Sequence, residues 1–188
     1  LGYLLGSIPS GWLAGRWLKG IDLRELGSGS TGATNVLRQV GKGPALVVFL
    51  IDVGKGAAAV LLARAFGQSD WIQVLAGLTA LAGHIWPAWL NFKGGKAVAT
   101  GFGMFLGLAW PVGLASFGVF LLTLLLFRIV SLSSVLAAVS LPLLMIRFSG
   151  IGSYILIALV AMGLVLWRHR SNLSRILEGS EPKVGQQD

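Results

Sequence analysis

Long apolar segments alternate with short polar segments over the whole chain. The apolar segments cover residues 1–18, 44–66, 71–89, 97–127, 132–148 and 151–167. Such segments are typical of membrane-spanning helices, which need about 20 predominantly apolar residues. The pattern therefore predicts an all-α, polytopic membrane helix bundle that forms a single transmembrane domain over residues 1–188.

The segment 97–127 decides how many times the chain crosses the membrane. A single helix of its 31 residues would be about 46 Å long, whereas a hydrocarbon core is about 30 Å thick. Pro111 offers a break near Trp110-Pro111, because proline cannot donate the hydrogen bond that a helix interior requires. The two resulting spans are short, and local thinning of the bilayer or tilt can accommodate them.

The distribution of lysine and arginine separates these two topologies. With the break, 12 of the 15 Lys and Arg residues lie on one side of the membrane, Arg64 and Arg147 lie on the other, and Lys55 lies inside a span. Without the break the division is 8 against 6. Basic residues concentrate on the cytoplasmic side. The count favours seven transmembrane helices with the N-terminus outside and the C-terminus cytoplasmic.

Composition agrees with a membrane protein. The chain is 55% hydrophobic and 12% charged, against about 25% charged residues in soluble domains. The positive-inside rule accounts for the net charge of +8, so we expect no nucleic acid partner. The absence of cysteine excludes disulfides, thiolate catalysis and Cys-ligated metal. No cleavable signal peptide is evident, and the chain opens directly in an apolar segment.

A loop rich in glycine and hydroxyl groups follows the first apolar segment. It runs from Gly27 to Arg38. Glycine lets the backbone approach an anion closely, and an arginine grips phosphate through two parallel hydrogen bonds. The alternative is a flexible linker between helices. As an anion site, the loop would use Gly27, Ser28, Gly29, Ser30, Thr34, Asn35 and Arg38.

A second polar segment follows the third apolar segment. His84 lies at its beginning, and Gly94-Gly95-Lys96 precede the next predicted helix. A positive helix N-terminus and a lysine can bind phosphate, although the spacing is not that of a P-loop. The alternative is a positively charged membrane anchor with a glycine turn. His84 is a candidate base or hydrogen-bond donor, or simply a histidine at the membrane interface.

A third predicted cytoplasmic segment, between the two halves of the apolar C-terminal region, also carries polar side chains. Arg128 precedes Ser131, Ser133 and Ser134, and we expect the serines to cap the following helix or donate to an anion.

The tail opens with a basic segment. Its Arg168-His169-Arg170 run is typical of anionic lipid binding, and His169 and Asn172 would share one face if the helix continued. Inside the second apolar segment, Asp52 and Lys55 are three residues apart and can pair, for function or for structure.

Three of these motifs together resemble the bacterial acyl-phosphate:glycerol-3-phosphate acyltransferases, small integral enzymes of phospholipid synthesis. The motifs are Gly27–Arg38, Gly83–Thr100 and Arg168–Leu173. This chain has Ser30-Thr31 where the family commonly has Asn-Pro, and Ala97 where the family commonly has Gly. The replacements are small or polar and should preserve an anion site.

The resemblance implies transfer of a fatty acyl group from acyl phosphate to the 1-hydroxyl of glycerol 3-phosphate, giving lysophosphatidic acid and inorganic phosphate. It implies a multi-pass protein of the bacterial inner membrane, with membrane lipids as partners and no cofactor or metal. We expect a monomer. The expected catalytic residues are Ser28, Arg38, His84, Lys96, His169 and Asn172. The expected substrate-binding residues are Gly27, Gly29, Ser30, Thr34, Asn35, Gly94, Gly95, Arg128, Ser133 and Ser134.

Two other functions fit parts of the sequence. A transporter of an anionic phosphorylated metabolite would need polar groups near the middle of the membrane, and only Asp52 and Lys55 qualify. A metal-dependent phosphotransferase would need clustered carboxylates. The carboxylates are scattered: Asp22, Glu25, Asp52, Asp70, Glu178, Glu181 and Asp188.

Overall fold

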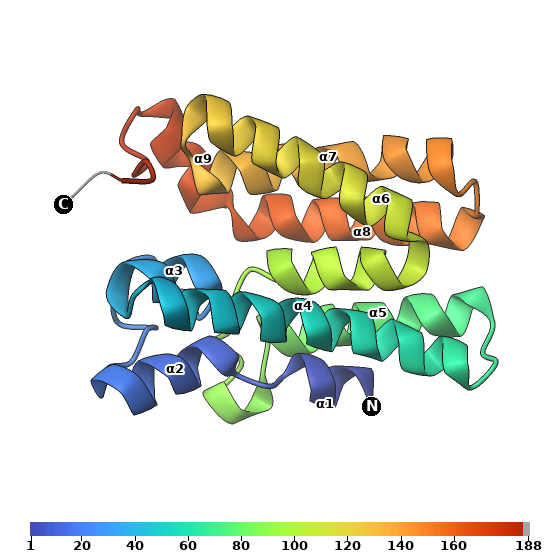
Figure 1. Cartoon of the computed structure of the whole chain (residues 1–188), viewed down its shortest axis with the longest axis horizontal. Coiled ribbons are helices and arrows are strands. Elements are labelled where there is room, and N and C mark those ends of the chain that lie inside the picture. Colours follow the sequence, from blue (N-terminus) through green and yellow to red (C-terminus); the bar gives the residue numbers. More distant parts are fainter. Residues whose placement is uncertain (186–188) are drawn as a thin grey trace. The chain divides into compact units, whose positions relative to one another are not determined.

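The computed structural model describes residues 1–185, which form α-helices and one short 3₁₀ helix and contain no strand (Figure 1). The helices fall into two compact units, and the boundary between them along the chain lies within α6, between Leu108 and Ala109. The prediction of an all-α fold is confirmed. The prediction of one domain over residues 1–188 remains a prediction.

The first unit begins with two short helices instead of one span. They are α1 (Gly2–Gly6) and α2 (Ser10–Lys19), and the break falls at Pro9, where the sequence of this apolar segment indicates an interruption. Proline at position 9 cannot donate a backbone hydrogen bond, which ends the helical ladder there. The break leaves the carbonyl of Ile8 outside a helix, and Lys55 Nζ donates to it at 3.0 Å.

The polar loop after α2 contains a short helix that hydropathy did not indicate. This helix, α3 (Ala33–Gln39), packs on α4 (Lys42–Ala65). A small hydrophobic cluster includes Leu23 and Val36, which are fully buried and lie before and after the glycine-rich stretch. The loop is therefore held at both ends by apolar packing, which argues against a flexible linker.

The remaining helices of the first unit are α5 (Asp70–Ile85), the 3₁₀ turn η1 (Ala88–Leu90) and the beginning of α6 (Val98–Phe127). α5 packs against α1 and α4 (Figure 1). Glycines permit close packing of α4 against α6, because a Cβ at Gly56 would overlap the carbonyl of Thr100 and a Cβ at Gly103 would overlap that of Val53. Such small-residue contacts are typical of helices in membranes.

The predicted interruption of the long fourth apolar segment is confirmed. Ala109 has non-helical dihedral angles (φ −150°, ψ 88°), and Pro111 follows it. The break deprives the carbonyl of Leu108 of its ordinary helical partner. Arg64 Nη2 donates to that carbonyl at 2.9 Å, and Arg64 Nε donates to Gln73 Oε1 at 3.2 Å. An arginine of α4 thus satisfies the backbone where α6 is interrupted.

The second unit contains the rest of α6, then α7 (Val130–Phe148), α8 (Gly152–Arg168) and α9 (Arg170–Leu177). α7 packs along α8, and α9 contacts both. The chain bends by 60° between α8 and α9.

Three helices of the described chain are long and apolar enough to cross a membrane: α4, α6 and α7. The bent pair α8 and α9 makes a fourth if it is counted as one broken span. Large apolar side chains are exposed on these helices, as in Leu50 (58%), Leu125 (78%) and Leu143 (72%), which suits contact with lipid. The seven spans and the orientation of the termini remain predictions.

Candidate active site

The glycine-rich loop adopts a conformation that depends on its glycines. Gly27 (φ +57°) and Gly29 (φ +64°) occupy the left-handed region, which side chains with a Cβ disfavour. A Cβ at Gly27 would also press on Asn35 Oδ1. Ser28 lies between these glycines and is exposed, whereas Ser30 is buried. The backbone thus requires glycine at these two positions, and the predicted contact of the loop with an anion stays a prediction.

The buried side chain of Asn35 binds backbone carbonyls within and before this loop. Its side chain is 1% exposed, and Nδ2 lies 3.0, 3.0 and 2.9 Å from the carbonyl oxygens of Leu23, Leu26 and Ser30. An amide nitrogen carries only two hydrogens, so these carbonyls already engage both. A direct bond from Nδ2 to phosphate, as predicted from the motif, would have to displace one of them.

Thr34 and Arg38 lie on α3, which forms the second half of the segment from Gly27 to Arg38. Thr34 is half-buried and Arg38 is exposed. Among residues 1–185, Arg38 makes no hydrogen bond or ion pair, so its guanidinium is available to an anion.

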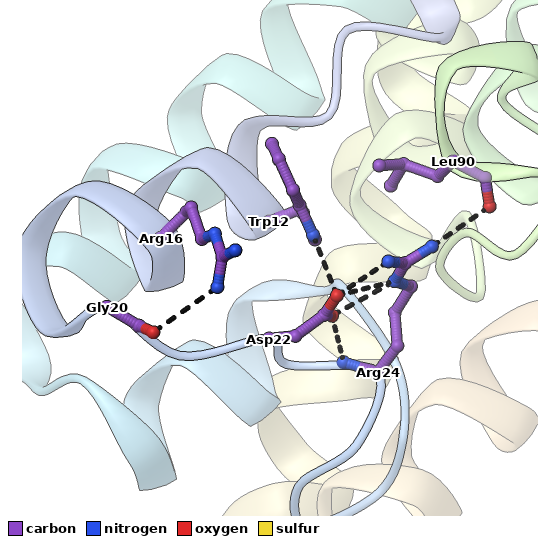
Figure 2. A network of polar contacts seen from close by, with 6 residues as sticks. All are labelled: Trp12, Arg16, Gly20, Asp22, Arg24 and Leu90. Atoms are coloured by element: carbon purple, nitrogen blue, oxygen red, sulfur yellow. Dashed lines mark hydrogen bonds and ion pairs between the residues drawn. The ribbon is translucent and has the colours of Figure 1, made fainter.

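An ion pair just before this loop, between Asp22 and Arg24, connects it to the turn after α5 (Figure 2). Arg24 donates to both oxygens of Asp22, through Nε at 2.9 and 3.1 Å and through Nη2 at 2.5 Å, and Trp12 Nε1 donates to Asp22 at 3.2 Å. Arg24 Nη1 donates to the carbonyl of Leu90 at 3.1 Å. The hydrogen bonds from Arg24 hold the pKa of the Asp22 carboxyl well below its ordinary range, although burial raises it.

The turn that contains Gly94-Gly95-Lys96 differs from the predicted phosphate site. The N–H groups of Gly94 and Gly95 donate to the carbonyls of Ile85 and His84, both at 3.1 Å. These amides satisfy the end of α5, so they would have to give up these partners to donate to phosphate, and their predicted role in substrate binding stays a prediction. Lys96, which is half-buried just before α6, is the charged group that this segment offers.

Ala97 has a left-handed backbone conformation (φ +59°) and is 4% exposed. Only glycine adopts this conformation without steric cost. The structure thus gives a physical reason why glycine suits this position.

A buried polar cluster lies under the same turn. Asp52 Oδ1 accepts hydrogen bonds from Ser10 Oγ and pairs with Lys55 Nζ, both at 2.7 Å, which confirms that Asp52 and Lys55 pair. His84 Nδ1 lies 3.6 Å from the same oxygen and 3.1 Å from Thr100 Oγ1. The sequence placed Asp52 and His84 in separate segments and gave no sign that they meet.

A small pocket opens where these segments converge. Its lining includes Ser10, Thr31, Lys55, His84 and Pro87. Thr31 belongs to the glycine-rich loop, and Pro87 belongs to the turn after α5. The first unit therefore brings together two of the three motifs found in the sequence.

The third motif lies in the second unit. His169 is 3% exposed, and its Nδ1 lies 2.8 Å from the carbonyl of Val165. A carbonyl only accepts hydrogen bonds, so Nδ1 carries the proton. Asn172 is 5% exposed. The helix bends between α8 and α9, with buried His169 at the bend and buried Asn172 in the first turn of α9.

Glu181 organises this part of the second unit. Its Oε1 accepts from Asn172 Nδ2 at 2.6 Å and Ser131 Oγ at 2.7 Å, and its Oε2 accepts from Arg175 Nε at 2.8 Å. Burial raises the pKa of the Glu181 carboxyl, but these three donors outweigh burial and hold it below its ordinary value. The sequence analysis counted Glu181 only as a scattered carboxylate.

The serines at the start of α7 do not cap it, contrary to our expectation. α7 has no side-chain cap, and Ser133 and Ser134 donate to the carbonyls four residues earlier, Ile129 and Val130, at 2.8 and 2.9 Å. Both serines are buried, and their hydroxyl hydrogens serve their own helix. Arg128 is exposed and donates to the carbonyl of Val184 at 2.9 Å.

Within residues 1–185, no three His, Asp or Glu side chains lie close enough together to hold one metal ion. Asp188 lies outside the described residues.

Known proteins resemble the chain over nearly its whole length. The family model described as glycerol-3-phosphate acyltransferase matches residues 1–179. A glycerol-3-phosphate acyltransferase of Parasynechococcus marenigrum (strain WH8102) is 75% identical over 99% of this chain and 88% of its own length. One from Synechococcus sp. (strain CC9902) is 71% identical over 99% of this chain and 93% of its own.

Solved structures agree with the sequence matches. The crystal structure of PlsY, described as an integral membrane glycerol 3-phosphate acyltransferase in its glycerol 3-phosphate form, has a TM-score of 0.91 and 40% identity. The match covers 98% of this chain and 92% of that one. The lysophosphatidic acid form has a TM-score of 0.89 and 39% identity over the same shares.

Proposed function

The chain belongs to the glycerol-3-phosphate acyltransferase family, and from that premise we propose that its acyl donor is an acyl phosphate. The acceptor is the 1-hydroxyl of sn-glycerol 3-phosphate. The products are lysophosphatidic acid and inorganic phosphate, which makes this the first step of phospholipid synthesis. The solved relative is named in glycerol 3-phosphate and lysophosphatidic acid forms, which supports the proposed acceptor and product.

The observation that carries the proposal is the meeting of two cationic polar segments in the first unit. Arg24, just before the glycine-rich loop, donates a hydrogen bond to the carbonyl of Leu90 in the turn after α5. The loop leads to the exposed Arg38, and the turn leads to Lys96. Both hydrophilic groups of the proposed reaction are phosphates, and arginine and lysine are the side chains that bind phosphate.

The chemical step needs little help from the protein. The 1-hydroxyl oxygen attacks the acyl carbonyl carbon, an ester bond forms, and the bond from that carbon to the bridging phosphate oxygen breaks. The electron pair leaves with phosphate, and positive charge from Lys96 and Arg38 stabilises the leaving group. The hydroxyl proton passes to a phosphate oxygen of the substrate, whose second pKa is about 6.

The other motif residues have supporting roles in this proposal. Ser28, exposed between two left-handed glycines, donates a hydrogen bond to phosphate and is not a nucleophile. His169 and Asn172 of the third motif keep the catalytic role that the family resemblance implies. His169 carries its proton on Nδ1, which leaves Nε2 able to accept a hydrogen bond when the imidazole is neutral.

The proposed setting is a bacterial plasma membrane. The chain crosses it seven times, with the N-terminus outside and the motif loops on the cytoplasmic face, where soluble glycerol 3-phosphate is at hand. The acyl chain of the donor lies among the lipid-facing helices. The protein acts as a single-domain monomer without a metal or organic cofactor.

The test is phosphate release by the purified protein in detergent or lipid. Palmitoyl phosphate is supplied with and without glycerol 3-phosphate, and palmitoyl-CoA is supplied in parallel. The proposal predicts release only when both palmitoyl phosphate and glycerol 3-phosphate are present. Transfer from palmitoyl-CoA alone would discard the proposed donor, and no turnover with either donor would contradict the enzyme itself and direct attention to vesicle flux.

A further inference from the structure

Asp52 is a buried carboxylate that the proposed chemistry does not use. It lies on α4, within an apolar segment, and is 1% exposed. Three donors or cations surround Oδ1: Ser10 Oγ at 2.7 Å, Lys55 Nζ at 2.7 Å and His84 Nδ1 at 3.6 Å. This single oxygen therefore joins α4 to the beginning of α2 and the end of α5.

Stability alone is a poor explanation for this arrangement. Removing two charges from water costs several kcal/mol per ion, and well-packed apolar residues often replace a buried ion pair without loss. Burial of Asp52 and Lys55, both at most 5% exposed, points to a role in fixing a geometry. Polar networks in a low-dielectric interior are strongly directional when every member is satisfied.

The geometry that the cluster fixes is that of His84. The His84 side chain is 7% exposed, and Thr100 Oγ1, from the first turn of α6, lies 3.1 Å from Nδ1. The opposite edge of the ring faces Gly95, because a Cβ at that glycine would overlap His84 Nε2. The carbonyl of His84 also accepts the N–H of Gly95. The ring of His84 thus packs against Gly95, and its backbone carbonyl binds the N–H of Gly95, the residue before Lys96.

We propose that Asp52 is a positioning residue that acts through His84 to set the place of Lys96. Asp52 fixes the imidazole from one side, the imidazole supports Gly95 from the other, and Lys96 follows directly in the chain. The inference rests on the proposed function of Lys96 as a phosphate-binding group. If Lys96 binds the phosphate of one substrate, removing the Asp52 charge should therefore weaken binding of that same substrate.

The variant that isolates this role is the double substitution Asp52→Asn with Lys55→Met. Asp52→Asn alone would leave the Lys55 charge buried without its partner, which destabilises a protein strongly. The double variant removes both charges and keeps side-chain size. The Ile8 carbonyl that Lys55 leaves keeps the N–H of Ser10 as a donor at 3.0 Å, so we expect a thermal midpoint close to that of the wild type. We expect a KM about tenfold higher for one phosphate substrate, with kcat changed less than KM. Lys96→Arg, which keeps the charge but moves it, should raise the KM of the same substrate.

A second pair of variants keeps the test decisive if the double variant does not fold. Thr100→Val removes the hydroxyl beside His84 Nδ1 at nearly constant shape, and Thr100→Ser restores it. We expect Thr100→Val to raise the same KM, and we expect the KM of Thr100→Ser to be close to that of the wild type. Thr123→Val is the matched control, because Thr123 is a buried threonine of α6 that donates to Val119 of its own helix, and its kinetics should be those of the wild type.

Several results would overturn the inference. Wild-type KM values in a folded double variant would make the ion pair purely structural, and so would equal behaviour of Thr100→Val and Thr123→Val. The inference would also be contradicted if the double variant raised the KM of one substrate and Lys96→Arg raised only the KM of the other. An inactive wild-type protein would instead contradict the proposed function, so the two failures are distinguishable.

Discussion

Arg24 Nη1 donates a hydrogen bond at 3.1 Å to the backbone oxygen of Leu90, which lies 66 residues further along the chain. Figure 2 shows that the same guanidinium also donates hydrogen bonds to the carboxylate of Asp22. An arginine can do this because its planar fork offers five donors in fixed directions. The contact links the segment just before the glycine-rich loop to the turn before Lys96, so the two segments that we propose to bind phosphate both depend on it.

We predict that Arg24→Lys lowers catalytic efficiency, kcat/KM, about tenfold. A lysine keeps the charge but cannot hold Asp22 and Leu90 at once. Arg16→Lys is the matched control. Arg16 makes a 3.4 Å bond to Gly20 at the exposed end of α2, so the same exchange should leave kcat/KM within about twofold of the wild type. Equal loss in both variants would show that the contact to Leu90 does not position the loops.

We predict that Glu181 makes stability depend on pH in the acidic range. The pKa of this carboxyl is lowered in the folded protein, so its stabilising effect is fully present above the unfolded value of about 4.3 and is lost as the pH falls below it. The thermal midpoint of Glu181→Gln should be lower than that of the wild type at pH 7 and fall less between pH 5 and pH 3. Parallel curves for the two proteins would contradict the network around Asn172.

Position 97 should tolerate glycine better than a branched side chain. For Ala97→Gly we expect a change of less than about 1 kcal/mol in the free energy of unfolding, because relief of the left-handed backbone offsets the lost methyl group and the added chain entropy. Ala97→Val should cost about 2 kcal/mol or more. Ala99→Gly, at an ordinary helical position, should cost about 1 kcal/mol. Thermal or denaturant unfolding in detergent measures all three.

Arg64 should affect stability and not kinetics. Arg64→Met removes the donor to the carbonyl of Leu108, and a buried carbonyl without a partner costs about 1–3 kcal/mol. We expect a lower thermal midpoint with an unchanged KM for both substrates. Arg147→Met, which removes an exposed arginine lying over Phe148, should leave the midpoint nearly unchanged. A raised KM in Arg64→Met would show that the interruption of α6 reaches the site.

Hydropathy and charge predicted the helical fold and the interruption at Ala109, because helix length and a proline are local properties. They did not predict α3, which depends on packing around Leu23 and Val36. Pro9 indicated the interruption of residues 1–18, but not that Lys55 would reach the carbonyl of Ile8 there. Seven spans were inferred from a count of charges, and helix length and apolar character alone support three, or four with the bent pair.

The motifs located two segments of the site but not how they are held. Asn35 and the amides of Gly94 and Gly95 have the chemistry of anion ligands, yet they bond to backbone carbonyls here. That use depends on which carbonyls the folded chain leaves nearby, and a sequence motif does not contain this information. The Asp52 cluster escaped detection for the same reason, since its members come from α2, α4, α5 and α6.

The central claim is tested most directly by following the acyl group and the phosphate in one reaction. Purified protein receives palmitoyl phosphate and glycerol 3-phosphate, and mass spectrometry and a phosphate assay measure the products over time. The account predicts 1-palmitoyl lysophosphatidic acid and inorganic phosphate in equal amounts, with no free palmitate. Phosphate released at the same rate with palmitate in place of lysophosphatidic acid would identify a hydrolase and contradict the account.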